Sequence, residues 1–153
     1  MSDSIWKPHT TVAAMCEREG KFLLVKEKIA GKIVFNQPAG HLEVHESLLD
    51  AVIRETREET LYEFTPSGLL GIYRSIPDDS PDITYIRFLF CGTVGQHRHD
   101  GQLDDGIISA DWMSYDEVAA SREQHRSPLV LQCIDDYLDK KPYSLKVLSP
   151  EFR

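Results

Sequence analysis

Apolar residues in the first third of the chain fall into short runs separated by turn-forming residues. Two such runs, His9 to Glu17 and Lys21 to Lys28, flank Arg18-Glu19-Gly20, in which the glycine favours a tight turn. The pattern predicts a β-hairpin. A third, shorter strand is predicted over Lys32 to Asn36, and the Pro and Gly of residues 37–40 end it.

The pattern changes to a helical period between Glu46 and Thr60. Residues that can pack against a core recur at helical spacing on one side of this segment, and acidic residues lie mostly on another side. The packing residues are Leu49, Val52, Ile53 and Thr56. The segment is therefore predicted to be an amphipathic helix.

Strand-like runs return at Leu69 to Ser75 and at Thr84 to Val94, separated by the turn-rich sequence IPDDSPD. A short strand around Ser109 to Met113 is predicted to lead into another helix. This helix starts at Ser114, because Ser114 and Glu117 have capping-box spacing.

The last predicted helix runs to about Asp139, with Ser127 as its N-cap and Pro128 at its first position. The order of strands, helix, strands and helices indicates an α+β fold with a sandwich-like mixed sheet, and not a regular array of β-α-β units. No repeat or linker interrupts the sequence, so residues 1–153 are predicted to form a single domain.

Composition narrows the class of protein. A hydrophobic share of 41% and a charged share of 27% are typical of a soluble globular protein, and no apolar run approaches the length of a membrane span. The N-terminus lacks the apolar core of a signal peptide, and Cys16, Cys91 and Cys133 show no paired spacing. A cytoplasmic protein is expected. The net charge of −8 disfavours an extended nucleic-acid surface but allows a small phosphorylated substrate bound through a cation.

Three carboxylates in the helical segment carry the most chemical information. Glu55, Glu58 and Glu59 lie within an arc of about 100° on a helix, so they can point at one place. Like charges packed this closely destabilise a helix unless a cation lies among them, and Mg²⁺ prefers carboxylate oxygens. The alternative is a solvated helix face on which Arg54 and Arg57 pair with neighbouring acids.

The residues around the cluster favour the metal site. Gly40, five residues, Glu46, seven residues and then Arg54-Glu55-Thr56-Arg57-Glu58-Glu59 resemble the signature of the Nudix hydrolases. The resemblance implies the α/β/α sandwich of that family, with a central mixed β-sheet and a catalytic loop-helix-loop. It also implies an enzyme that cleaves a nucleoside diphosphate derivative or a related pyrophosphate with Mg²⁺ or Mn²⁺.

The resemblance also implies roles for individual residues. The implied metal ligands are Glu55, Glu58, Glu59 and the carbonyl of Gly40. Glu58 is the first choice for the general base that activates a metal-bound water. Arg54 is expected to orient Glu55 or its neighbours, and Glu46 to pair with Arg54 and fix the loop against the helix.

Two positions depart from the signature. Thr56 replaces an apolar residue, but its methyl group can still pack. Leu61 replaces the closing glycine, which normally suits a left-handed helix cap, and a residue with a side chain there costs on the order of 1 kcal/mol. We therefore expect Leu61 to affect the helix end and not the metal ligands, which all precede it.

Three segments outside the signature narrow the substrate. FNQPAGHLE, TYIRFLF and RSPLV are similar to a bacterial, phosphatase-like branch of the family. This resemblance implies hydrolysis of nucleoside di- and triphosphates or thiamin-type pyrophosphates, with release of orthophosphate. The alternatives are a Nudix pyrophosphatase that acts on a nucleotide sugar or a capped RNA end, and a non-catalytic nucleotide-binding module on the same fold.

Side chains outside the helix are candidates for substrate binding. Arg87 alternates with apolar neighbours along a strand, so it can point toward a cleft and bind phosphate, or face outward on a half-exposed strand. Phe35, Tyr73 and Tyr85 can stack on a base or pyrimidine ring, or each can pack in the core.

Two loops carry the remaining candidates. Asp104 and Asp105 precede the strand of Trp112 and can supply a further acid to the site, or simply form a solvated turn. His41 and His45 can touch phosphate but are unsuited to hard cations, and His97 and His99 are given no catalytic role. The expected partners are a small phosphorylated substrate and no membrane, for a monomer or a homodimer.

Overall fold

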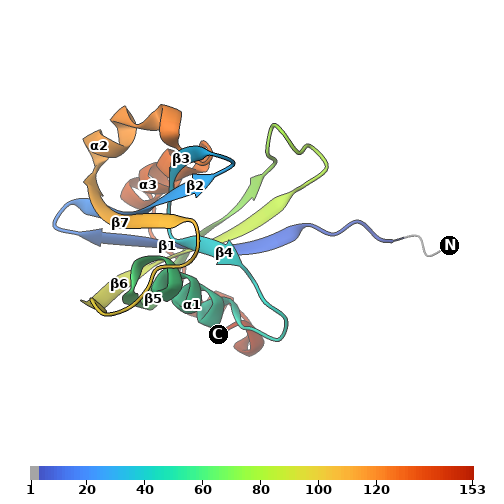
Figure 1. The fold of residues 1–153 in the computed structure, drawn as a ribbon. Coiled ribbons are helices and arrows are strands. Elements are labelled where there is room, and N and C mark those ends of the chain that lie inside the picture. The colour runs from blue at the N-terminus through green and yellow to red at the C-terminus, as the bar shows by residue number, and fades with distance from the viewer. Residues whose placement is uncertain (1–3) are drawn as a thin grey trace.

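The structure is a computed structural model that describes residues 4–153, so the first three residues of the predicted domain lie outside the described part. A mixed β-sheet lies between helices (Figure 1). Its elements are β1 (His9–Arg18), β2 (Lys21–Ile29), β3 (Lys32–Asn36), β4 (Ala39–His41), α1 (Leu48–Thr60), β5 (Tyr62–Ser75), β6 (Tyr85–His97), β7 (Ile107–Ser114), α2 (Tyr115–Ala120), η1 (Arg122–Gln124), α3 (Leu129–Asp139), η2 (Leu145–Val147) and η3 (Pro150–Phe152).

The central strand β1 organises the sheet. The strand order is β3-β2-β1-β6-β5, with β4 paired to β1 and β7 paired to β2. β1 runs parallel to β6 from the His9–Tyr85 pair to the Cys16–Gly92 pair, and antiparallel to β2 and β4. The mixed sheet with helices on both faces confirms the predicted α/β/α sandwich.

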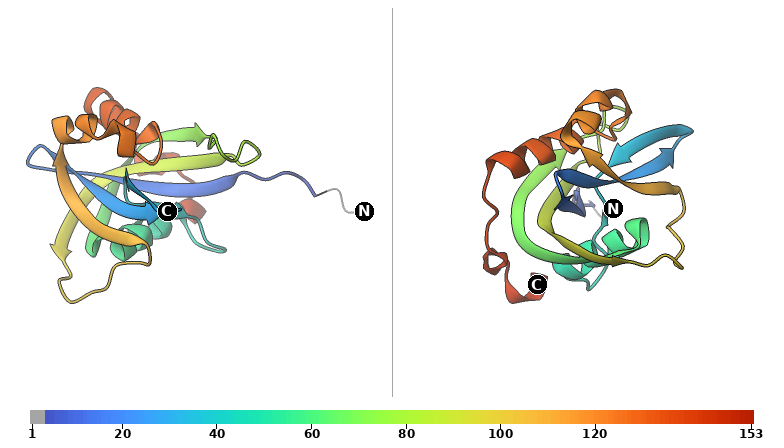
Figure 2. Two further views of the ribbon diagram at one scale, coloured as in Figure 1. Left: turned by 45° about the horizontal axis from the view of Figure 1, so that its top comes forward. Right: turned by 90° about the vertical axis from the view of Figure 1, so that its left-hand side faces the viewer.

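The core lies on both faces of β1. Val12 and Ala14 pack in the hydrophobic cluster that includes α1 residues, whereas Ala13 and Met15 pack in the cluster that includes α3 residues. Figure 2 shows α1 and α3 on opposite sides of the sheet. Because successive side chains of a strand point to opposite faces, a strand covered on both sides is apolar throughout.

Several element boundaries differ from those predicted. The helix begins at Leu48 and not Glu46, because the Ser47 side chain accepts a hydrogen bond from the Asp50 N–H and caps it. The last helix begins at Leu129 with Pro128 as N-cap, one residue later than predicted, and the Ser127 hydroxyl accepts from the Leu129 N–H at 3.3 Å. The capping box of Ser114 and Glu117 is present as predicted.

Two strands differ from the predicted pattern. The sequence predicts turn residues at 37–40, but Ala39, Gly40 and His41 form β4 and pair with β1. β5 begins at Tyr62 and not at Leu69. Its first half contains Pro66 and Gly68, which disfavour a regular strand, and register shifts accommodate them.

Candidate active site

The loop before α1 is shaped by its own backbone. The Glu43 N–H donates to the Glu46 carboxylate at 3.0 Å, and the Glu46 N–H donates to the Glu43 carbonyl at 3.2 Å. His45 takes a positive φ of 63° in this turn. The loop thereby carries Glu46 from β4 to the start of α1 and leaves its carboxylate facing the helix.

Arg54 is the cation at the centre of the site. Its Nε donates to Glu46 Oε1 at 2.6 Å, and its Nη2 donates to Glu46 Oε2 at 2.9 Å and to the His41 carbonyl at 3.0 Å. Its Nη1 donates to Glu55 Oε1 at 2.8 Å and to Glu58 Oε2 at 3.2 Å. The structure thus brings together four of the charged residues of the signature, and one guanidinium connects the loop to the helix.

These contacts shift the titration of the groups involved. The hydrogen bond from Arg54 lowers the pKa of Glu46, and it raises the pKa of Arg54 itself. The pKa of Glu55 is raised, chiefly because the carboxylate is buried, although Arg54 opposes this shift. Burial disfavours the negative charge of Glu55, so a further positive charge beside this carboxylate is favourable.

Glu59 is the most buried of the three carboxylates, with 8% of its surface exposed. Its Oε2 accepts a hydrogen bond from the Ala39 N–H at 2.9 Å. The pKa of Glu59 is raised to about 9, chiefly because the carboxylate is buried, and the negative charge of Glu55 contributes to the shift. The backbone of β4 is therefore in direct contact with the acidic face of α1.

Gly40 lies directly against Glu55. A Cβ atom on Gly40 would stand 2.0 Å from the carboxyl carbon of Glu55 and 2.2 Å from each of its oxygens. Only glycine leaves room for the carboxylate at this distance from the backbone. This contact gives a physical reason for a glycine at this position, apart from its predicted role as a ligand through the carbonyl.

Glu58 is the most open of the cluster, with 41% of its side chain exposed against 12% for Glu55. Its backbone carbonyl accepts a hydrogen bond from the Asp104 N–H at 3.0 Å. The charge of Asp104 also raises the pKa values of Glu55 and Glu59. The structure thus brings Asp104 to the cluster.

Asp105 has no comparable place. It is exposed in the same turn, and within the described part of the chain it makes no hydrogen bond to α1. The turn closes with the Ile107 N–H donating to the Asp104 carbonyl at 3.1 Å. Of the two neighbouring acids, only Asp104 is tied to α1.

The helix end departs from the signature as expected. Leu61 adopts the left-handed conformation at φ 61° and ψ 15°, and its N–H donates to the Arg57 carbonyl. Thr56 is fully buried, and its hydroxyl donates to the Val52 carbonyl at 2.7 Å. Leucine therefore takes the conformation that glycine usually supplies, and the threonine packs in the core.

Arg87 is buried and pairs with two amide side chains. It is 9% exposed, and its guanidinium donates to Gln37 Oε1 at 3.4 Å and to Asn36 Oδ1 at 3.3 Å. The outward-facing interpretation is therefore wrong, because the face of β6 from which Arg87 projects is covered, and contact between Arg87 and a substrate phosphate stays a prediction. Burial lowers the pKa of this guanidinium, which has amide partners and no carboxylate hydrogen-bond partner among the described residues.

The aromatic candidates have different surroundings. Phe35 is 9% exposed and belongs to the core, and the Tyr73 hydroxyl donates to Asp136 Oδ2 at 2.7 Å. Tyr85 is half-buried, with its ring 6.0 Å from that of His41, whose carbonyl accepts from Arg54. Of the three, Tyr85 alone lies beside residues of the site.

Sequence reasoning missed Glu27. This β2 residue has 17% of its side chain exposed and lies 3.6 Å from Arg126 Nη1, and its charge raises the pKa of Glu59. Burial raises the pKa of Glu27 itself, and Arg126 opposes the shift. A register irregularity between Lys26 and Glu27 turns the strand here, and the alternating pattern carried no signal for it.

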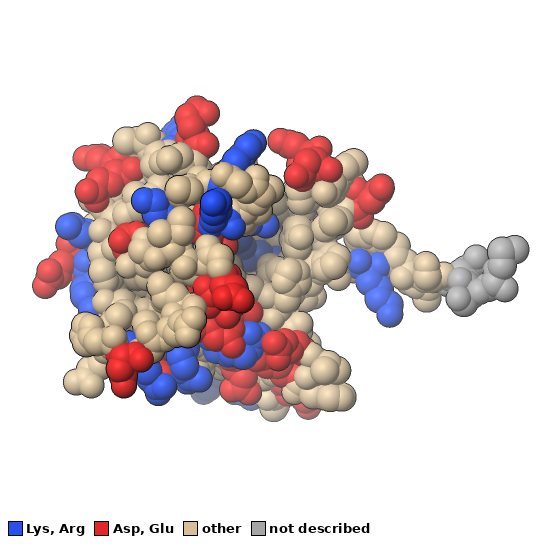
Figure 3. Space-filling view, in the orientation of Figure 1, with Lys and Arg blue, Asp and Glu red and all other residues tan. Residues whose placement is uncertain are grey.

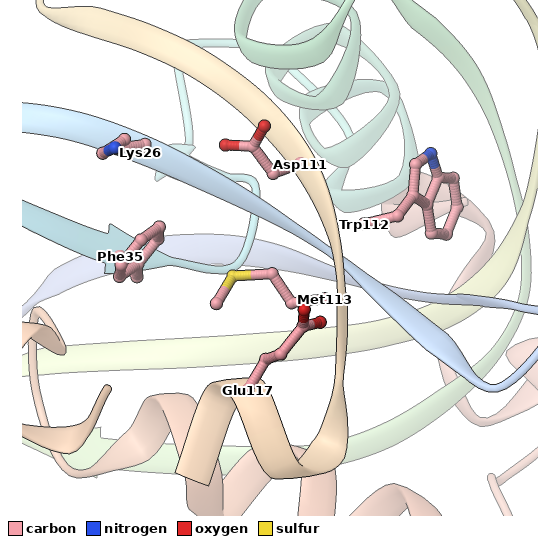
Figure 4. Close-up of a pocket in the computed structure, with 6 residues that line it drawn as sticks. All are labelled: Lys26, Phe35, Asp111, Trp112, Met113 and Glu117. Atoms are coloured by element: carbon pink, nitrogen blue, oxygen red, sulfur yellow. The ribbon is translucent and has the colours of Figure 1, made fainter. Parts of the chain in front are cut away.

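Neither of the two pockets described next is lined by a residue of the acidic cluster. One, of about 360 Å³, is lined by residues of β2, β3, β7 and α2, including Lys26, Asp111 and Glu117 (Figure 4). A larger one, of about 630 Å³, lies by η1 and α3 and includes Arg122 and Arg126. Arg126 lines the larger pocket and also lies 3.6 Å from Glu27, whose charge raises the pKa of Glu59. Figure 3 shows acidic side chains gathered on the middle of the front face beside basic ones.

Comparison with known proteins decides what this arrangement is. The family model of the NUDIX domain matches residues 7–133, which include the whole loop and α1. The chain belongs to the Nudix family. This Nudix protein is 39% identical over 145 residues to phosphatase NudJ of Escherichia coli K12, covering 94% of this chain and 92% of that protein.

Solved structures agree with this assignment. A NUDIX hydrolase from Nitrosomonas europaea has 47% identity and a TM-score of 0.90, with coverage of 94% of this chain and 97% of that one. A UDP-X diphosphatase shares the fold at 18% identity and a TM-score of 0.72. The protein is a Nudix phosphohydrolase.

Within the described residues, no helix has the length and apolar character needed to cross a bilayer.

Nudix hydrolases generally use divalent metals such as Mg²⁺, and the site fits such an ion. The donors are hard carboxylate oxygens, Glu59 is buried with a raised pKa, and Gly40 leaves its backbone open toward Glu55. Among the described residues, the carboxylates do not yet converge as a metal-binding group, because Arg54 holds Glu55 and Glu58, and Ala39 holds Glu59. These bonds engage one oxygen of each carboxylate, and among the described residues the other oxygens, Glu55 Oε2, Glu58 Oε1 and Glu59 Oε1, accept no hydrogen bond and are available to a cation.

Proposed function

We propose that this Nudix domain hydrolyses phosphoanhydride bonds in nucleoside di- and triphosphates or thiamin-type pyrophosphates, with Mg²⁺ and release of orthophosphate. The observation that carries the proposal is the buried acidic face of α1, which touches the backbone of Ala39 and Gly40 and has Arg54 as its nearest cation. The 39% identity to a protein named a phosphatase supports orthophosphate as a product.

The proposed metal ligands are Glu55, Glu58, Glu59 and the Gly40 carbonyl. When bound, Mg²⁺ supplies charge neutralisation for the substrate phosphates and acidifies a water molecule. Glu58 is proposed as the general base, because its carboxylate is the most exposed of the three to solvent. Arg54 holds the carboxylates in place, and Glu46 fixes Arg54 through two hydrogen bonds.

Asp104 is proposed as a further acid of the site. Its backbone is anchored to the Glu58 carbonyl, so its side chain stays near the cluster. An additional carboxylate can bind a cation or orient water. Asp105 provides the matched control, since it differs from Asp104 by one position and is not anchored to α1.

On the substrate side, Arg126 and Tyr85 are the proposed contacts. Arg126 lines the larger pocket and lies near Glu27, so it can bind a phosphate that extends away from the carboxylates. Tyr85 can stack on a ring near His41. Arg87 and Phe35 are further proposed contacts, although each has only 9% of its surface exposed, and Phe35 lines the smaller pocket.

A phosphate-release screen tests the proposal. Purified protein is incubated with nucleoside di- and triphosphates, thiamin diphosphate and nucleotide sugars, with and without Mg²⁺, and the products are separated. Mg²⁺-dependent orthophosphate supports the proposal. A nucleoside monophosphate with an intact second fragment supports the alternative pyrophosphatase, and binding of Mg²⁺ and nucleotides without turnover across the panel supports a binding module.

Substitutions assign the residues. Glu58→Gln and Glu59→Gln are expected to lower kcat by on the order of 100-fold or more, because each removes a charged ligand or base. Asp50→Asn on the exposed first turn of α1 is the control and keeps turnover. Asp104→Asn is expected to lower kcat while Asp105→Asn does not, and equal activity of the two variants would remove Asp104 from the site.

A further inference from the structure

Two histidines stand close together at the far end of β6. His97 is the last residue of the strand, and His99 follows it by two positions in the next loop. Their Nδ1 atoms share a hydrogen bond at 3.1 Å, and the ring centroids are 4.6 Å apart. Both atoms are nitrogen donors of the type that binds transition metals, and neither belongs to the acidic cluster on α1.

The backbone places both rings on the same side. Residues two apart in an extended chain point the same way, and the intervening Arg98 points elsewhere, to Glu63 at 2.8 Å. The Arg98 N–H donates to the Leu61 carbonyl at 2.9 Å, and the Gly101 N–H donates to the Arg98 carbonyl at 3.1 Å. The loop is therefore held in the shape that pairs the rings.

Aromatic packing supports the position of His97. The ring of Tyr62 meets that of His97 edge-on, with centroids 4.8 Å apart. Tyr62 in turn accepts a hydrogen bond from the Trp112 indole N–H at 3.2 Å, and Arg18 lies over both rings. A ligand held by such packing loses less conformational freedom when it binds a metal.

The nitrogen separation fits a shared ion. Zn²⁺ binds histidine nitrogen at about 2.0–2.1 Å. Two such bonds to atoms 3.1 Å apart enclose an angle of about 100°, between square-planar and tetrahedral values. A metal ion takes the place of the proton between the two nitrogens, and the soft χ2 torsion of histidine lets both lone pairs turn toward it.

We propose that His97 and His99 form a bidentate site for a borderline divalent transition metal, with Zn²⁺ as the probe. The two imidazoles supply nitrogen ligands, whereas the carboxylates of α1 supply oxygen ligands, so the two sites differ in the metal they prefer. His99 is exposed, which leaves the other coordination positions to water. Binding there links the end of β6 to the loop that continues to Asp104.

Nitrogen-15 NMR of the histidine rings is the decisive measurement. The wild-type protein is titrated with Zn²⁺ in excess Mg²⁺, and the Nδ1 resonances of His97 and His99 are expected to shift together at one equivalent. Calorimetry is run on wild type, His97→Asn, His99→Asn and the control His45→Asn, which removes one exposed histidine elsewhere. Each variant of the pair is expected to weaken the nitrogen-ligated Zn²⁺ site by at least about tenfold, and the control is expected to retain it.

Three results would overturn the proposal. They are the absence of any Nδ1 shift, a shift of only one ring, and equal Zn²⁺ affinity in wild type and both variants of the pair. Zn²⁺ bound only at the carboxylates of α1 produces the last result, and the NMR spectra identify it. None of these readouts depends on catalytic turnover.

Discussion

Gly40→Ala is the most specific test of the contact between β4 and α1. The added methyl group would lie 2.0 Å from the Glu55 carboxyl carbon and 2.2 Å from both carboxylate oxygens. Gly40 is not among the glycines with positive φ, so alanine is compatible with its backbone. The substitution therefore acts through the space that Glu55 occupies and not through backbone strain.

The displacement can be worked from the structure. A Cβ atom essentially never stands closer than 3.0 Å to such a neighbour, and 3.0 minus 2.0 leaves a shift of at least 1.0 Å for the carboxylate. Glu55 has 12% of its side chain exposed and is held by Arg54 at 2.8 Å, so it cannot swing freely into solvent. A misplacement of about 1 Å in a catalytic arrangement costs on the order of 100-fold in rate.

Product release under saturating Mg²⁺ measures the effect, and thermal unfolding monitors the fold. We expect kcat/KM to fall about 100-fold, with a loss of about 1–3 kcal/mol in unfolding free energy from the crowded contact. Gly95→Ala is the control, since the nearest atom to its added methyl is the Glu63 carbonyl oxygen at 4.0 Å. A folded Gly40→Ala protein with wild-type turnover would refute the reasoning, because Glu55 would then function without this contact.

Three further predictions concern stability and reactivity. Arg54→Lys keeps a charge but loses the two hydrogen bonds to Glu46, so we expect a loss of about 1–3 kcal/mol in urea unfolding at pH 7. Arg54 lowers the pKa of Glu46 in the folded protein, so the stabilisation from this pair is complete above the ordinary pKa of 4.5 and is lost as pH falls through the lowered pKa. A stability difference between wild type and Arg54→Lys that stays constant into acid would contradict this reasoning. Leu61→Gly is expected to change the unfolding free energy by less than about 1 kcal/mol. Glycine relieves the cost of the left-handed conformation but loses the side-chain contact with Gly101, and the two effects offset each other. A larger change measured by calorimetry would show that one effect dominates. Burial raises the pKa of Cys16 to about 12 and of Cys133 to about 11, and it also raises that of Cys91, so a thiol reagent at pH 8 should label the protein only after denaturation.

Local pattern was sufficient for much of the fold. The first three strands and the acidic helix follow from apolar alternation, turn residues and helical period, because these signals depend on neighbours in sequence. β4 could not be found this way. Its three residues include a glycine, follow Pro38, and form a strand only because β1 lies alongside. The first half of β5 likewise depends on pairing with β6.

The same division applies to the site. The spacing of Glu55, Glu58 and Glu59 along a helix is local, so sequence places them on one face. Arg87 was harder, because alternation shows that a side chain leaves the sheet but not what covers that face. Glu27 and Asp104 depend on a strand irregularity and on a hydrogen bond to the helix end, and neither has a sequence signature.

The end of α1 connects these observations. Leu61 occupies a left-handed position that glycine would fill more easily, yet its carbonyl accepts the Arg98 N–H and its side chain lies against Gly101. One turn earlier, the Glu58 carbonyl holds Asp104. A glycine at position 61 would keep the backbone hydrogen bond but lose the side-chain contact. The departure from the Nudix signature therefore gives the loop after β6 a second attachment, on the same helix that carries the carboxylates.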